Sequence, residues 1–131
     1  MTWWFRLAAT MTTGLPNLSL EEFTAALGNS APPDGLDNAL RALWYEARSA
    51  GPGATPPRKS IEDAMSDDWN SAHDLVQRQR DERSRWVHGY LHRVEGDDDN
   101  ARGWYKRAGQ SFPALSLADE WAQISIALLA R

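Results

Sequence analysis

Apolar residues recur at the three- and four-residue spacing of amphipathic helices along most of the chain. Helices are expected over residues 19–27, 36–49, 67–80, 82–95, 98–108 and 116–129, with a further short helix starting near residue 60. No segment shows the convincing alternation of apolar and polar residues that a strand requires. We therefore expect an all-α fold of five or six helices packed as antiparallel hairpins.

Capping and turn residues support several of these boundaries. Ser19 and Glu22 have the spacing of a capping box, and Gly28 follows the last apolar residue of that helix. The stretch AGPGATPPRKS, residues 50–60, has the composition of a Gly/Pro loop with no regular element of its own. The acidic turn EGDDDN separates the two helices between residues 82 and 108, and its aspartates suit the first turn of the second helix.

Small residues in WVHGYLHRVEGDDDNARGWYKRAG resemble those of a tetratricopeptide repeat. The matching positions are Gly89, Gly96, Ala101, Tyr105, Ala108 and Pro113. The resemblance covers about residues 82–115 and implies two closely packed helices ended by the proline. His88 and His92 stand where that family has leucine-type and tyrosine-type residues. The chain is also similar to a group of small, uncharacterised bacterial helical proteins, a resemblance that implies no activity.

Length and composition limit the class of protein. The chain has 131 residues, and we expect a single helical domain over residues 18–131 behind a mobile or loosely packed leader at residues 1–17. The formal net charge of −4 argues against a nucleic-acid partner. The basic run of Arg78, Arg80, Arg83 and Arg85 is interrupted by acids, so we interpret it as a solvated helix face rather than an anion-binding patch.

The chain lacks cysteine, which excludes disulfides, thiolate metal sites and thiol nucleophiles. No apolar stretch approaches the roughly 20 residues of a membrane span. The N-terminal residues do not have the order of charge, apolar core and cleavage site of a secretory signal. We expect a cytoplasmic protein whose metal ligands, if it has any, are histidines and carboxylates.

The three histidines of the chain are expected to converge. His88 and His92 are four residues apart on one helical face, and His73 lies in the preceding helix, which packs beside them if the hairpins stack. Three imidazoles can hold Zn²⁺ and leave one position open for water. We therefore expect a divalent metal, preferably zinc, and metal-assisted hydrolysis of a small ester or phosphoester substrate. Two histidines with one carboxylate would suit Fe(II) or Mn(II) instead.

Other side chains are candidates for supporting roles. Glu95 or Asp74 could act as a general base or orient a histidine, with or without a metal. Tyr105 could donate a hydrogen bond to a developing oxyanion, and Trp86 and Tyr90 are candidate pocket walls.

The main alternative is a metal-free, repeat-like interaction module with structural histidines. Such a module would bind a protein or peptide partner and would expose an apolar patch suited to self-association into a homo-oligomer.

Overall fold

The computed structural model describes residues 18–48 and 67–130, and all regular structure in these two ranges is helical. The elements are α2 (Leu20–Ala25), the 3-10 turn η1 (Ala26–Gly28), α3 (Asn38–Arg48), α5 (Asp67–Val76), α6 (Glu82–Val94), α7 (Asp98–Arg107) and α8 (Leu117–Leu129). The predicted all-α class is confirmed. The predicted leader at residues 1–17, the Gly/Pro loop at 50–60 and the helix starting near residue 60 lie outside the described residues.

Short polar side chains start most of these helices. Ser19 and Glu22 form the expected capping box, in which each side chain accepts a hydrogen bond from the other's backbone N–H. Asp81, Asp97 and Ser116 cap α6, α7 and α8 more simply. Each accepts one backbone N–H through a side-chain oxygen. Helix α5 ends at Val76, short of the expected end near residue 80, and the extended Asp81 then caps α6.

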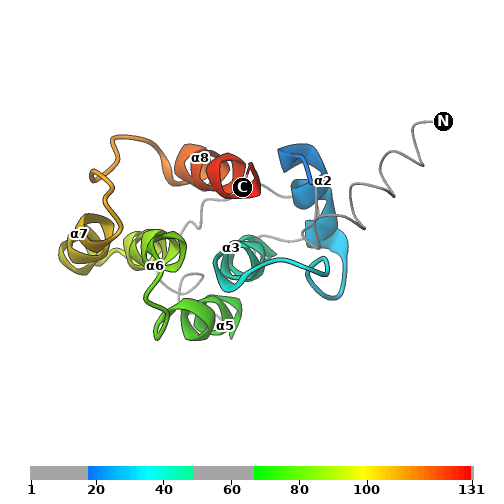
Figure 1. Ribbon diagram of the computed structural model, residues 1–131, viewed down its shortest axis with the longest axis horizontal. Helices are drawn as coiled ribbons and strands as arrows, with labels where there is room; N and C mark the ends of the chain where they lie inside the picture. The colour runs from blue at the N-terminus through cyan, green and yellow to red at the C-terminus, as the bar shows by residue number, and fades with distance from the viewer. Residues whose placement is uncertain (1–17, 49–66, 131) are drawn as a thin grey trace.

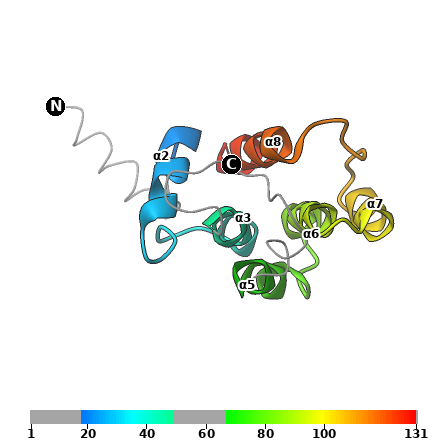
Figure 2. The same ribbon diagram turned by 180° about the vertical axis from the view of Figure 1, so that it is seen from behind.

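Helix α6 lies in the middle of the molecule. It contacts α7, α5, α3 and α8, and α3 also packs against α5 (Figures 1 and 2). The helices therefore form two antiparallel hairpins, α3 with α5 and α6 with α7. Helix α8 packs against α3 and α6, and α2 packs against α8 at one end of the molecule. None of the described helices has both the length and the hydropathy needed to cross a membrane.

Buried tryptophans join the helices through their indole N–H groups. Trp44 on α3 donates to the carbonyl of Ala26 at 2.9 Å, and Trp121 on α8 donates to the carbonyl of Leu43 at 3.1 Å. Trp69 on α5 donates to the carbonyl of Leu91 at 2.9 Å. Each large apolar ring thus buries its area without leaving its donor unpaired, which keeps the desolvation penalty small.

The α6–α7 hairpin depends on two glycines. Gly96 turns the chain with a φ of +88°, a conformation that side chains with a Cβ disfavour. At Gly89 the two helices approach so closely that an added Cβ would lie 3.2 Å from Tyr105 Cδ1 and 3.3 Å from both the Ala101 carbonyl oxygen and Trp104 Cβ. The close approach is the one that the small-residue pattern of the sequence predicts.

We expect Gly89→Ala to destabilise the protein by about 1 kcal/mol. Alanine stabilises a helix interior by about 1 kcal/mol relative to glycine, but overpacking against backbone and ring atoms typically destabilises the fold by about 1–3 kcal/mol. The control is Gly103→Ala on α7, where an added Cβ meets nothing within 4 Å and should stabilise by up to about 1 kcal/mol. Chemical denaturation of both variants checks this, and equal stabilisation by both would contradict the close approach.

Candidate metal centre

The three histidines come together between α5 and α6. His88 and His92 project from adjacent turns of α6, and His73 faces them from α5. One ring nitrogen from each histidine lies within 4.8 Å of those of the other two. His88 and His92 are buried and His73 is half-buried, so the cluster forms one continuous group that is partly open at His73. The expected convergence of the three histidines is confirmed.

Two tryptophans stack on the cluster from opposite helices. Trp69, one turn before His73 on α5, lies parallel to the His73 ring with centroids 4.9 Å apart. Trp104 on α7 stacks on His88 with centroids 3.9 Å apart. Both indoles restrict the orientation of the imidazole against which they pack. Trp69 stands four residues before His73 on one helix, so the sequence could have identified it as a neighbour of the cluster. Trp104 lies on another helix, and no local spacing links it to His88.

The two aromatic residues expected as pocket walls lie elsewhere. Trp86 and Tyr90 each lie two residues from His88, which on a helix is a rotation of roughly 200°. Trp86 packs, half-buried, against the hydrophobic core. Tyr90 is fully buried, and its hydroxyl donates to Glu46 Oε1 at 3.1 Å.

Glu95 supports the cluster from the end of α6. Its Oε2 lies 2.5 Å from Nδ1 of His92. Because a carboxylate only accepts, Nδ1 carries the proton in this contact, and Nε2 is the ring nitrogen that Glu95 does not engage. A carboxylate on the far nitrogen is the usual partner of a metal-binding histidine. Asp74, by contrast, is exposed and accepts a hydrogen bond from the Gln77 amide at 3.0 Å.

Burial keeps two of the imidazoles neutral. It lowers the pKa of His88 to about 3, with further lowering by His92, His73 and Arg107. The pKa of His73 is also lowered, by burial and by His92, against the opposing charges of Asp74 and Glu95. Near pH 7 both rings therefore present lone pairs rather than positive charge, which is the state that a metal ion requires.

The spacing of the nitrogens suits a shared ion. Two imidazole nitrogens on one tetrahedral zinc lie about 3.3 Å apart, given Zn–N bonds of about 2.0–2.1 Å. The Nε2 atoms of His73 and His88 are 3.1 Å apart. Nδ1 of His88 is buried and has no hydrogen-bond partner among the described residues, so the protein leaves this ring less satisfied than a purely structural histidine.

A second group of ligand atoms shares His92 with the cluster. His92, Glu95 and Asp97 each offer an atom within the same 4.8 Å limit. Asp97 is exposed, however, and its carboxylate already caps α7 by accepting from the Asn100 N–H at 3.2 Å. Glu95 is bonded to His92. These contacts favour supporting roles for both acids over a separate metal site.

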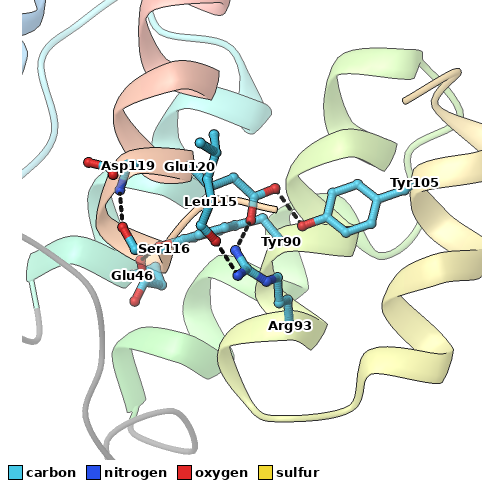
Figure 3. A network of polar contacts seen from close by, with 8 residues as sticks. All are labelled: Glu46, Tyr90, Arg93, Tyr105, Leu115, Ser116, Asp119 and Glu120. Atoms are coloured by element: carbon cyan, nitrogen blue, oxygen red, sulfur yellow. Dashed lines mark hydrogen bonds and ion pairs between the residues drawn. The ribbon is translucent and has the colours of Figure 1, made fainter. Parts of the chain in front are cut away.

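Tyr105 directs its hydroxyl toward Glu120 on α8 (Figure 3). It donates to Glu120 Oε2 at 2.5 Å, while Arg93 binds Glu120 Oε1 at 2.7 Å and also donates to the carbonyl of Leu115. Glu120 is only 1% exposed. Burial raises the pKa of Tyr105, and the neighbouring Glu120 raises it further, so the phenol stays protonated. The expected oxyanion donor therefore serves the buried carboxylate that joins α8 to the hairpin.

Comparisons of the chain with protein-family models, curated proteins and solved structures give no match. The fold and the site themselves define the class: a helical protein with a buried cluster of three histidines that could bind a metal ion. Trp69, Trp104 and Glu95 surround that cluster.

We expect the metal-free protein to lose stability as the pH falls below about 6.5. The folded-state pKa of His88 lies near 3, below its ordinary value of 6.5, so the unfolded chain takes up a proton that the folded chain does not. The loss for this group should reach about 2 kcal/mol between pH 7.5 and pH 5. Urea denaturation of chelator-treated protein at both pH values measures it. The loss should shrink in His88→Gln, and equal stability of the parent at both pH values would contradict the assignment.

We expect Tyr105→Phe to lower the free energy of unfolding by about 1–3 kcal/mol, because the buried Glu120 carboxylate loses a hydrogen bond. The same variant should bind divalent metal as the parent does, since the hydroxyl bonds to Glu120 and not to a histidine. Tyr45→Phe is the control, because within the described residues Tyr45 makes a ring contact with Trp44 and its hydroxyl makes no hydrogen bond. A Tyr105→Phe variant with parental stability and impaired metal binding would show that the hydroxyl serves the histidine cluster and not Glu120.

Proposed function

We propose that the protein binds one divalent metal ion, preferably zinc, through His73, His88 and His92. The observation that carries the proposal is the placement of three ring nitrogens within 4.8 Å of one another in a buried setting. A histidine must be neutral to bind a metal ion. Burial lowers the pKa values of His73 and His88 and so keeps both rings in that state.

Zinc suits this set of ligands. It accepts imidazole nitrogen readily and adopts a tetrahedral site with three protein ligands and one open position. The chain has no cysteine to form a closed thiolate site. The half-buried side of the cluster at His73 is where the open position would meet solvent. Iron(II) or manganese(II) would require a carboxylate ligand, and Glu95 is already bonded to His92.

The activity that we propose is hydrolysis of an ester or phosphoester in a small-molecule substrate. A bound zinc ion supplies a water whose pKa is near neutrality. Within this chain, Glu95 holds His92 in the tautomer that leaves Nε2 for binding, which favours an orienting role over that of general base. Trp69 and Trp104 fix the rings of His73 and His88 and exclude water from their faces.

A metal-free interaction module is the second candidate, and one observation favours it. The contact of 3.1 Å between His73 and His88 can itself be an N–H···N hydrogen bond between two neutral rings. In that case the histidines stabilise the contact of α5 with α6 and bind nothing. A partner surface would then include Ile126 on α8 and Leu115 just before it, the large apolar side chains that are exposed among the described residues.

Metal analysis and zinc titration of untagged protein separate these candidates. The parent should contain or bind close to one equivalent of zinc, whereas His73→Gln, His88→Gln and His92→Gln should each weaken binding by about a hundredfold or more. Removing the carboxylate partner in Glu95→Gln should weaken binding by about tenfold to a hundredfold. Gln77→Ala, an exposed change one turn after His73, is the matched control and should bind as the parent does.

No zinc in the parent and no affinity for added zinc would refute the metal proposal. Loss of stability in the histidine variants without any change in metal content would favour the interaction module. If zinc binds, hydrolysis of p-nitrophenyl acetate and p-nitrophenyl phosphate tests the activity. Turnover should disappear with chelator and return with zinc.

A further inference from the structure

Two arginines lie at the same end of the α6–α7 hairpin, next to the histidine cluster. Arg85 precedes His88 by one turn on α6, and Arg107 follows Trp104 by one turn on α7. The two helices run antiparallel, so both steps lead in the same direction from the stacked pair of His88 and Trp104. Two contacts fit this antiparallel register of α6 and α7. Gly89 packs against Trp104, and the Glu82 carboxylate lies near Gly109.

Neither guanidinium forms an ion pair within the part of the chain that the structure describes, and the Glu82 carboxylate at this end of the hairpin lies near Gly109 instead. Arg107 lies over the Trp104 ring, 4.5 Å from its centroid, and forms no ion pair there. Arg85 likewise has no carboxylate partner, and its Nε atom is buried without a hydrogen bond. Arg83, from the same basic run, binds Asp37 at 2.7 Å and the carbonyl of Leu128 at 3.2 Å. Arg85 is therefore not part of a solvated face, as the sequence pattern suggested, but half-buried beside the cluster.

An anion at this place would remove one energetic penalty and add one favourable contact. The buried Nε–H of Arg85 would gain an acceptor, and the exposed guanidinium of Arg107 would gain a counter-charge. The field of Arg107 reaches the cluster, since it contributes to the lowered pKa of His88. Guanidinium groups match phosphate oxygens better than they match a neutral ester, because the hydrogen bonds are charge-assisted and can be bidentate.

We propose that Arg85 and Arg107 bind the phosphoryl oxygens of a phosphoester substrate beside the three-histidine site. The inference rests on the proposed function for its chemistry, and it narrows the substrate from esters in general to phosphoesters. The arginines would hold and orient the anion beside the histidines, where a bound zinc ion would supply the water for hydrolysis. Trp104 would keep both groups in register, because it stacks on His88 and lies under Arg107.

The first test uses metal-free protein and inorganic phosphate, with binding followed by NMR or calorimetry at low salt. The parent should bind phosphate, and binding should weaken as salt is added. Arg85→Gln and Arg107→Gln should each weaken it by about tenfold, and the double variant by more. Arg102→Gln is the matched control. It removes a guanidinium that also lies over an aromatic ring of this region, Phe112, but it should leave phosphate binding unchanged.

The second test uses zinc-loaded protein and two substrates with the same leaving group. For p-nitrophenyl phosphate, kcat/KM should fall by about tenfold or more in Arg85→Gln and Arg107→Gln. For p-nitrophenyl acetate, it should change by less than about threefold. Zinc affinity, measured separately, should remain parental in both variants. Equal effects on the two substrates would refute the arginine site.

The two proposals fail in different ways. Zinc that does not bind to the parent, together with phosphate binding that requires Arg85 and Arg107, would refute the metal site and keep the anion site. Zinc that binds normally, together with a metal-free parent that does not bind phosphate, would refute the anion site alone. Phosphate binding that Arg102→Gln weakens as much as Arg107→Gln does would also overturn it, since the effect would then be one of net charge.

Discussion

The close approach of α6 and α7 at Gly89 is the constraint on which the rest of the structure depends. A Cβ at this position would be crowded, because ring, backbone and Cβ atoms of α7 lie 3.2–3.3 Å from where it would be. At this separation Trp104 stacks on His88 with centroids 3.9 Å apart, and Tyr105 reaches Glu120 on α8. One glycine therefore sets the geometry on two sides of the hairpin.

These two sides satisfy buried polar groups in different ways. Toward α8, Glu120 receives hydrogen bonds from Arg93 and Tyr105, so a buried charge is paired and the contact is structural (Figure 3). Toward α5, the histidines are neutral, and His88 keeps a buried nitrogen with no partner in the described part of the chain. A protein gains little stability from such a group, which is why the histidine side is the better candidate for function.

The surroundings of the cluster also determine which chemistry is plausible. Glu95 supplies the carboxylate that commonly orients a zinc-bound histidine, and the lack of cysteine leaves nitrogen and oxygen as ligands. Arg85 and Arg107 add positive charge at one end of the hairpin, and neither guanidinium forms an ion pair among the described residues. The proposed metal together with the two guanidiniums would favour a substrate that carries negative charge.

The sequence by itself determined the helices, their caps and the hairpin. Apolar periodicity and local cap chemistry act within a few residues, so the box of Ser19 and Glu22 and the turn at Gly96 could be read directly. The four-residue spacing also placed His88 and His92 together. Only the tertiary structure decided what surrounds them. Trp104 and Arg107 come from another helix, and their positions depend on how closely and in which register the helices pack, which local patterns do not specify. The same reason explains Tyr105, whose place on α7 was clear from sequence but whose hydroxyl bonds to α8 rather than to the histidines.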